Sequence, residues 1–575
     1  MPLLRQLSLL STSKLQVSSG TMSMPTLQTL TVTANSLLQV ANAQLLNAAA
    51  GNARTPPAAG GSIVSSSTLT ASAGFLHLGV AGGLNLSSST VAADVSTEIK
   101  ALWLHASGSS ITASSIEVHA TNLTLVSTSK LQTDGLGAST LGAGTFRQAD
   151  SFCCPTNVAS SAVSMTSARS CAGTGGGGHG GHGGGVGGGS PYGSVDKPTS
   201  AGSAGASGTF LSYGPYTPGA STASNNNNNN NRWTHTNKWN VLGYSQWSWQ
   251  PRACIAGAAG GRGGGVIRIV VEDTLRMHAG CSISSDGASP AARPGPGGSG
   301  GSVWLTAGRV VGGGVVSANG GVPGGAATSG TWSSSSSSSG GGGAGGRIAV
   351  HFSQSSSVPD ELSLQAFGGQ LAGSEGGPAG TVYTNLSHSD GVLVVSNDGE
   401  SSNKWTCLDA AFPFKLSRLS VQAASWLKLD CDGALAQTPS IGTLQLQAAK
   451  LECIYDCTLD VEDAVPLSAG AQVQGGGDLT LGLLGQLDVM SSSSVHATGA
   501  LAMPVLLVLN ILSGSSVHIS SAAVLPKVQA VTVAESSSLS TGSSLSMASV
   551  ENVTVSDAST LSTGSSLSMA SVESV

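Results

Sequence analysis

The sequence predicts an all-β protein: a right-handed parallel β-helix, or β-solenoid, with a disordered Gly/Asn-rich insertion. Three observations predict this fold class: a glycine-rich unit repeated between residues 257 and 384, a 22-residue repeat near the C-terminus, and short alternating apolar segments near the N-terminus. Repeats of roughly 20–50 residues are typical of solenoids and propellers. Because each repeat buries its apolar face against its neighbours, a stack of repeats forms one continuous core.

The glycine-rich unit defines a region at residues 256–400. Each copy starts with small residues and continues as a short β-branched segment, and the four copies begin at Gly263, Gly300, Gly345 and Ala379. In the first three copies a second short segment follows, and these segments end at Gly287, Gly320 and Gly368. Short β-branched runs between glycines favour strands over helices. Glycine before a strand permits the close backbone approach of a tight corner.

Residues 1–145 are expected to form N-terminal coils of the same solenoid. Similar segments recur 23 residues apart at Leu15 and Leu38. Apolar and polar residues alternate at 30–33 and at 123–126, which predicts half-buried strands. A helix is the alternative for residues 36–50, which are rich in Leu, Ala and Gln.

Residues 146–255 interrupt the pattern and are interpreted as a largely disordered low-complexity insertion. The segment contains a glycine-histidine run with His179 and His182, and an asparagine tract at 225–231. It ends in four tryptophans, Trp233, Trp239, Trp247 and Trp249. These tryptophans are interpreted either as a small packed lid on the solenoid or as an aromatic platform for sugar rings or another protein.

Residues 401–575 return to a short period and are expected to form C-terminal coils. The segments at Val495 and Val517, and those at Val531 and Val553, are each 22 residues apart. Residues 539–551 recur at 561–573. A unit of 22 residues can supply two or three short strands plus their corners, which makes one coil.

The glycine-histidine run from Gly175 to His182, the segment Tyr192–Ser194 and the repeats ending at Val350 and Tyr383 resemble the glycine-rich repeats of large surface proteins of plants, algae and bacteria. The resemblance covers residues 175–391. It implies a pectin-lyase-like β-helix without catalytic activity, adhesin-like in character. In some algal members such segments precede receptor-like modules and a membrane anchor. The asparagine tract and the tryptophan cluster depart from the family pattern, and the resemblance carries over no functional residue.

Composition argues against several classes of partner. Only 9% of the residues are charged and the net charge is −6. Without a basic patch, nucleic acid and anionic membranes are not expected partners. The longest apolar run, residues 501–512, is shorter than the ~20 residues that span a bilayer, so no membrane span is expected in this chain. We recognise no signal peptide, and a start and an end within repeats suggest a fragment.

Acidic residues are the first candidates for catalysis, because a glycosidase needs two carboxylates ~5–9.5 Å apart. The candidates are Asp273 with Asp286, and the group Asp456, Asp460, Glu462 and Asp463. The sequence more readily explains them as solvated turn residues. His179 and His182 lie in flexible glycine, and Cys453 and Cys457 form a C-x₃-C without a second pair, so no metal site is expected. We therefore assign no catalytic, cofactor-binding or metal-binding residue, and no cofactor.

Cysteines and glycosylation sequons bear on the compartment. Nine cysteines are too sparse for a disulfide scaffold. Cys407, Cys431, Cys453 and Cys457 could pair in an exported protein, and buried free thiols are the equal alternative. Sequons at Asn85, Asn122, Asn385 and Asn552 would be glycan acceptors in a secretory lumen. A Thr-x-Thr array at Thr29, Thr31 and Thr33 is too short to support ice binding.

The sequence therefore predicts a non-catalytic, extracellular or cell-surface structural or adhesive protein. Its expected partners are extracellular polysaccharide or surface proteins. Two alternatives remain open: a polysaccharide lyase or hydrolase on the same fold, and an ectodomain fragment of a membrane-anchored receptor-like protein. Fold alone does not choose among them.

Overall fold

The structure is a computed structural model of the 575-residue chain. It describes residues 6–569 with gaps. The gaps are residues 24–28, 46–61, 73, 139–174, 186, 207–208, 214–250, 257–258, 292–294, 325–339, 355–356, 388–389, 409–414 and 430–438.

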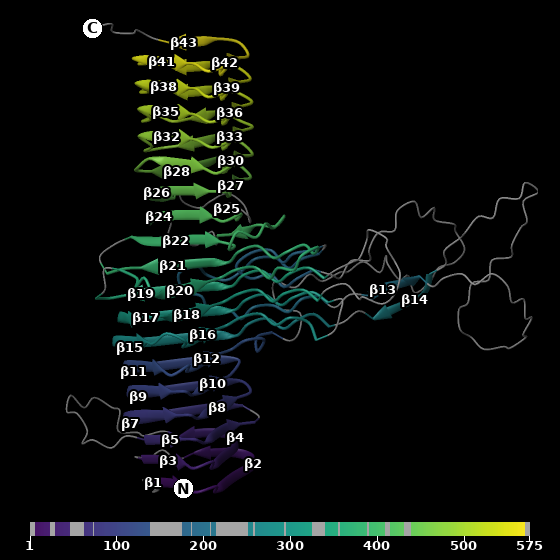
Figure 1. Ribbon diagram of the computed structural model, residues 1–575, viewed down its shortest axis with the longest axis vertical. Helices are drawn as coiled ribbons and strands as arrows, with labels where there is room; N and C mark the ends of the chain where they lie inside the picture. Colours follow the sequence, from purple (N-terminus) through teal and green to yellow (C-terminus); the bar gives the residue numbers. More distant parts are fainter. Residues whose placement is uncertain are drawn as a thin grey trace, which may run out of the picture.

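The described residues form a β-solenoid of about 18 turns, which confirms the predicted fold class (Figure 1). Strands of successive turns pair in parallel with one exception, and one sheet of 33 strands runs through the stack. A second sheet of eight strands flanks the C-terminal turns. Residues 37–45, within the segment where a helix was the alternative, form a strand. No helix occurs among the described residues.

The N-terminal coils contain the first twelve strands. Their long members, β7, β9 and β11, bend from one wall of the coil to the next. The bounds are β1 Gln6–Leu9, β2 Lys14–Ser23, β3 Thr29–Thr33, β4 Leu37–Leu45, β5 Ser62–Ser65, β6 Thr68–Ala71, β7 Phe75–Ser87, β8 Thr90–Ala93, β9 Ser96–Ser107, β10 Ser110–Thr112, β11 Ser115–Val126 and β12 Lys130–Gln132.

The glycine-rich repeats supply the middle of the stack, and each predicted opening is a strand. Ile267, Val303, Ile348 and Val382 are register partners on strands of four successive turns. A separate antiparallel pair precedes them, β13 Thr209–Tyr213 with β14 Pro251–Ala256. The bounds are β15 Val266–Met277, β16 Ser282–Ser284, β17 Ser302–Gly312, β18 Gly314–Ser317, β19 Arg347–Phe352, β20 Leu362–Gln365, β21 Thr381–Asn385 and β22 Gly391–Ser396.

The C-terminal coils follow the 22-residue repeat. Partners such as Val495 and Val517 lie directly above one another, as the repeat predicts. The bounds are β23 Thr406–Cys407, β24 Lys415–Gln422, β25 Trp426–Lys428, β26 Ser440–Gln447, β27 Lys450–Cys453, β28 Cys457–Val461, β29 Val465–Ser468, β30 Gln472–Gly475, β31 Leu479–Leu481, β32 Gln486–Val489, β33 Ser494–Ala497, β34 Leu501–Ala502, β35 Val508–Ile511, β36 Ser516–Ile519, β37 Ala523–Leu525, β38 Ala530–Val533, β39 Ser538–Thr541, β40 Leu545–Met547, β41 Asn552–Val555, β42 Thr560–Thr563 and β43 Leu567–Met569.

Buried serines form hydrogen-bonded ladders at one corner of the coils. The residues just before these serines adopt positive φ, as at Ser491 (54°) and Ser492 (61°). The hydroxyl of Ser515 then accepts a hydrogen bond from the backbone N–H of Ser493 at 3.2 Å, and the same contact joins Ser515 to Ser537. The ladder satisfies backbone donors that the sharp corner would otherwise leave buried and unpaired.

Replacing one ladder serine should destabilise the C-terminal coils. In Ser515→Ala the N–H of Ser493 loses its acceptor, so we expect a loss of about 1–2 kcal/mol in the free energy of unfolding. The adjacent Ser516 lies outside the core, and Ser516→Ala should change little. Urea unfolding of both variants measures the difference, and equal stabilities would show that the ladder contributes nothing.

The buried face of the main sheet changes midway along the stack. One register column runs Glu117, Arg268, Trp304, Ala349, Tyr383, Leu393, Leu419 and Leu444. Its first members face outward, and its last members are buried in the C-terminal core. The neighbouring column is buried at Ile116 and turns outward by Gln445. The solenoid therefore has two aliphatic cores on opposite faces of one continuous sheet.

The exchange of faces occurs where β21 and β22 pair antiparallel, within a sheet whose other described pairings are parallel. Residues 191–197 cover the start of the C-terminal core on β19 and β21. In this segment Val195 is fully buried in that core and the carbonyl of Asp196 bonds His351 Nε2 at 2.7 Å. Part of the predicted insertion thus closes the end of a core.

Candidate functional site

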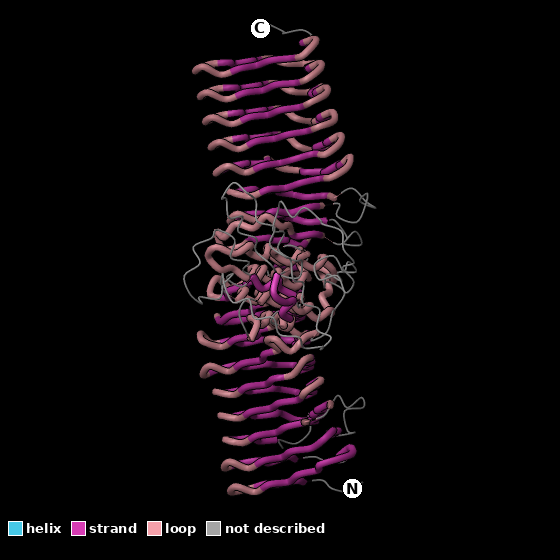
Figure 2. The backbone as a smooth tube through the Cα atoms, turned by 90° about the vertical axis from the view of Figure 1, so that its right-hand side faces the viewer, coloured by secondary structure: helices cyan, strands magenta, loops and turns pink. Residues whose placement is uncertain are grey.

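The glycine-rich connections between the middle coils pack together into a bundle that projects from one side of the solenoid (Figure 1). We call the described residues of 175–190, 200–206, 259–265, 285–301, 318–324, 340–346 and 366–380 the glycine bundle. Figure 2 shows these segments nearly end-on at mid-height of the stack. They carry almost no strand or helix, and most of their glycines are buried.

The backbone hydrogen bonds of the bundle repeat every three residues. The N–H groups of Gly342 and Gly345 bond the carbonyls of Glu375 and Pro378, and those of Gly343 and Gly346 bond Gly321 and Ala318. The N–H of Ala344 reaches a third segment, at Gly177. Residues 297–301 repeat the pattern. Three residues per turn without internal hydrogen bonds is the geometry of a polyproline II helix, so each segment bonds neighbours on three sides.

Buried polar side chains join the bundle to the solenoid. Arg347 is 1% exposed and donates to the carbonyls of Tyr192 (2.9 Å) and Cys407 (3.2 Å). His179 is fully buried, and its Nδ1 donates to the carbonyl of Gly300 at 2.9 Å. Burial, with the nearby charge of Arg347, lowers the pKa of His179 to about 3, so the imidazole stays neutral at pH 7. Burial also raises the pKa of Tyr192, whose hydroxyl donates to Ala201.

The glycine-histidine run is therefore packed in the part of the insertion that the structure describes. His179 faces Gly300, whereas the ring of His182 contacts Trp405 at 4.5 Å, so the two histidines do not form one site. No group of three or more His, Cys, Asp or Glu side chains with metal-binding geometry occurs within the described ranges. The four tryptophans at 233–249 lie outside the described residues.

The two acidic candidates of the middle repeats, Asp273 and Asp286, lie in different parts of the coil. Asp273 lies at an irregularity of register in β15, whereas Asp286 follows β16 at a corner. There Asp286 belongs to a ladder in which each side-chain oxygen accepts the backbone N–H of the next turn. Asp134 Oδ1 accepts from Asp286, Asp286 Oδ1 from Asn319, and Asn319 Oδ1 from Phe367. Burial, countered in part by these hydrogen bonds, raises the pKa of Asp286 to about 6.

Replacing Asp286 with asparagine should stabilise the protein at neutral pH. Because its folded pKa lies above the unfolded value of 3.8, Asp286 contributes stability below about pH 4 that is lost as pH rises through about 6. Asn319 already occupies the equivalent position one turn on. In Asp286→Asn we expect a gain of roughly 1–3 kcal/mol at pH 7 and none near pH 4.

The measurement is unfolding of parent and variant side by side from pH 4 to 7. His179, with its lowered pKa, makes both proteins lose stability as pH falls below about 6.5, and subtracting the two curves removes this contribution. A difference that does not change with pH would contradict the assignment to Asp286.

The C-terminal acidic candidates bind different neighbours. Asp456 Oδ1 accepts from the N–H of Asp478 at 2.8 Å, which makes a second corner ladder. Asp463 Oδ2 accepts from Thr443, Asp460 pairs in register with Ser440, and the N–H of Glu462 bonds Ile441. These four acidic residues therefore contact different neighbours at corners and between coils.

A paired carboxylate arrangement does exist where the sequence did not indicate it. Glu98 and Glu117 are register partners on the outward face of β9 and β11, one strand spacing or about 4.8 Å apart at Cα. Glu98 binds His77 (2.8 Å) and Lys100, and Glu117 binds His119 (2.8 Å) and Arg268 (3.0 Å). Arg268 in turn stacks on Trp304 at 4.8 Å. Only an alignment of successive coils by their strand register brings these residues together.

A second cluster lies where the bundle meets the C-terminal coils. Lys428 Nζ lies 3.7 Å from the ring centre of Trp405, and Lys450 Nζ lies 4.0 Å from that of Trp426. Both lysines bind Glu452, at 3.2 and 2.8 Å. Burial raises the pKa of Glu452, but the two lysines outweigh it and hold the pKa below its usual range. Because these cations and rings contact one another, the cluster mainly packs the junction.

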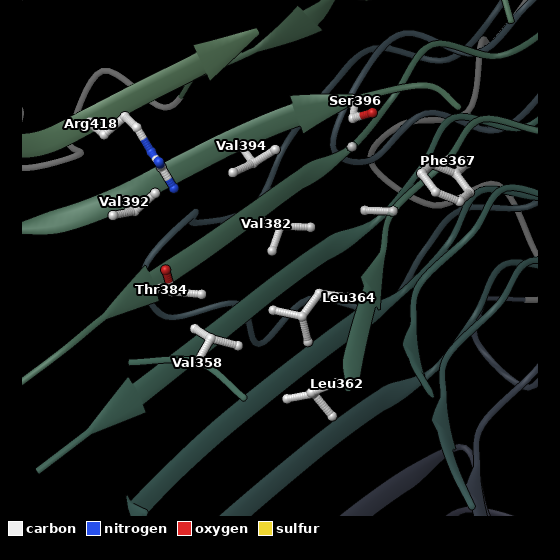
Figure 3. Close-up of a pocket in the computed structure, with 12 residues that line it drawn as sticks. Val358, Leu362, Leu364, Phe367, Val382, Thr384, Val392, Val394, Ser396 and Arg418 are labelled. Atoms are coloured by element: carbon white, nitrogen blue, oxygen red, sulfur yellow. The ribbon is translucent and has the colours of Figure 1, made fainter. Parts of the chain in front are cut away.

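An apolar groove of about 250 Å³ lies on the sheet face that is buried in the N-terminal coils and turns outward beyond them (Figure 3). Leu364 of β20, Val382 of β21 and Val394 of β22 line it, with Thr384 and Arg418 as polar members. Val382 and Val394 continue the buried column of Ile348, and Leu364 continues that of Val316. The groove is therefore a consequence of the exchange of faces.

Cysteine pairing partly follows the expectation. Cys453 and Cys457 form a disulfide with Cα atoms 6.0 Å apart, and Cys407 is also disulfide-bonded. Cys431 lies outside the described residues. Cys281 is a buried free thiol. The residues that the structure describes include no helix long and apolar enough to cross a bilayer.

No protein-family model matches the chain, and neither a curated protein nor a solved structure matches it.

Proposed function

We propose that this chain is a non-catalytic structural or adhesive protein of the extracellular space or cell surface. The observation that carries the proposal is the unbroken hydrogen-bonded sheet of 33 strands, which continues through the exchange of cores. About 18 turns at a strand spacing of ~4.8 Å make a rod of roughly 85 Å. The glycine bundle projects from this rod as a side arm, and repeated coil faces give weak, multivalent contacts.

Two further observations support the proposal. The disulfide bonds at Cys407 and Cys453 suit an oxidising compartment, since thiols stay reduced in the cytosol. Asp286 and Asp456 each accept a hydrogen bond from a backbone N–H group of a neighbouring turn, which is a structural use.

The test is retention of the full chain on insoluble cell-wall polysaccharides, with released reducing or unsaturated ends measured in the same tubes. We expect binding without release of ends. Failure to bind any matrix would contradict adhesion, and release of ends would overturn the non-catalytic proposal.

A polysaccharide hydrolase is the second candidate, and the Glu98–Glu117 pair is the observation that favours it. Two carboxylates on adjacent strands of an open face approach the spacing that glycoside hydrolysis requires. If ends are released, Glu98→Gln and Glu117→Gln should abolish the release, whereas Asp456→Asn should not.

A further inference from the structure

Trp103 lies flat on the outward face of the N-terminal coils. Its neighbour on β7 is Gly83, and a Cβ placed on Gly83 would lie 1.7 Å from Cε2 and 2.0 Å from Cζ2 of the indole. The missing side chain of Gly83 therefore provides the space in which the ring rests. Trp103 nevertheless keeps 40% of its surface exposed, whereas the adjacent Leu104 is 1% exposed. One face of the ring is packed and the indole remains open to solvent.

Uncharged polar side chains surround this ring on the same face. In register, Trp103 pairs with Asn122 of β11, and His105 pairs with Asn85 and Thr124. Asn85 Oδ1 is buried from solvent and has no hydrogen-bond partner among the described residues. Along the register partners of His105, the next charged side chain is Arg276, which pairs with Thr124 on the following strand. The patch therefore combines an aromatic platform with amide, imidazole and hydroxyl groups.

We propose that this patch binds the pyranose rings of a neutral polysaccharide. This proposal rests on the proposed adhesive function and names the class of ligand that the protein would bind. The negative face of an indole attracts the slightly positive C–H groups on the flat face of a hexopyranose with equatorial hydroxyls. The ring hydroxyls then reach Asn122 and His105 at the edge of the platform. A chain laid along the solenoid axis crosses successive coils.

The experiment is calorimetric titration of the full chain with a soluble β-linked glucose hexamer and, separately, with a uronic acid hexamer. Asn85 and Asn122 open glycosylation sequons, so the protein is produced in a host that does not glycosylate. We expect the neutral hexamer to bind, and Trp103→Ala to weaken binding at least about tenfold. Gly83→Ala displaces the ring and should weaken binding although Trp103 is still present.

Matched controls separate binding from folding. Phe75 is 59% exposed at the far end of β7, and Phe75→Ala should leave affinity unchanged. Arg276→Gln should also leave affinity for the neutral hexamer unchanged. Thermal unfolding of each variant confirms that the fold is retained, and Trp103→Phe, which keeps an aromatic ring, should bind with intermediate affinity.

Each outcome of these measurements supports or overturns the proposed site. Equal affinity of Trp103→Ala and parent, or binding of only the uronic acid hexamer, overturns the site. Retention on an insoluble matrix without any binding of the hexamers overturns the site but leaves the adhesive function standing. Binding of the neutral hexamer that depends on Trp103, without retention on any matrix, supports the site and contradicts the adhesive function.

Discussion

Gly343→Ala is expected to disrupt the glycine bundle. A Cβ at this position would lie 1.9 Å from the carbonyl oxygen of Gly298 and 2.5 Å from its carbon. The obstacle is backbone, which is hydrogen-bonded on its other sides and cannot move without breaking those bonds. We expect a loss of roughly 3 kcal/mol, at the upper end for overpacking in a buried site. Amide hydrogen exchange at residues 297–301 and 340–346 should accelerate.

Gly485→Ala is the matched control. Gly485 lies in a C-terminal coil, and no atom approaches a Cβ placed there within 4 Å. We expect a change within about 0.5 kcal/mol. If Gly343→Ala is as stable as Gly485→Ala, and exchange within the bundle is unchanged, the close three-sided packing described above is incorrect.

Arg347→Met should release the bundle from the solenoid. The guanidinium satisfies the buried carbonyls of Tyr192 and Cys407, and methionine fills the volume but donates no hydrogen bond. Two buried acceptors would lose their donors, so we expect a loss of about 3–4 kcal/mol. Limited proteolysis should cut near residues 190–200 earlier than in the parent. Arg347→Lys keeps the charge without the planar fork and should recover only part of the stability.

Arg309→Met tests whether any arginine would give the same result. Arg309 is exposed, and its Nε donates to Thr274 at 2.9 Å. Because water can replace that contact, we expect a change within about 0.5 kcal/mol. Similar losses in the two methionine variants would contradict the role of Arg347 in holding the bundle.

The solenoid itself could be predicted because side chains of similar type recur at equivalent positions in successive repeats. Val495 and Val517, which occupy the same position in successive repeats, are stacked partners, and the strands that open the glycine-rich units lie in register. Alternation of apolar and polar residues reports a half-buried strand directly. It does not report which face of the sheet is inward. For this reason the exchange of cores at Tyr383 and Leu393 was not predictable from alternation.

The glycine bundle could not be predicted, because its bonds involve backbone atoms alone. Ala344 and Gly177 are bonded partners that lie far apart in the chain, and glycine carries no pattern that would identify them. The sequence alone predicts these glycines to be corners or part of an insertion. Only the motif that ends at Gly287, Gly320 and Gly368 had a visible signal, since an Asp, Asn or Phe precedes each glycine and these residues form the corner ladder.

The outward faces were the least predictable part. Glu98 with Glu117, and Gly83 with Trp103, are partners on successive N-terminal coils, and the two pairs differ in their separation along the chain. Their proximity therefore depends on the exact register of unequal turns, which no strict repeat in the sequence reveals. The sequence candidates Asp456, Asp460 and Asp463 were close in the chain instead, and neighbours along a strand or corner point in different directions.

The composition of the glycine bundle sets its response to temperature. Aliphatic cores gain most of their stability from removing apolar surface from water, and this contribution weakens in the cold. The bundle has few side chains, so opening it exposes mainly peptide groups, which lower rather than raise the heat capacity. Its stability curve should therefore be much flatter than that of the coils. On cooling, the arm should keep its packing while the rod that carries it loses part of its stability.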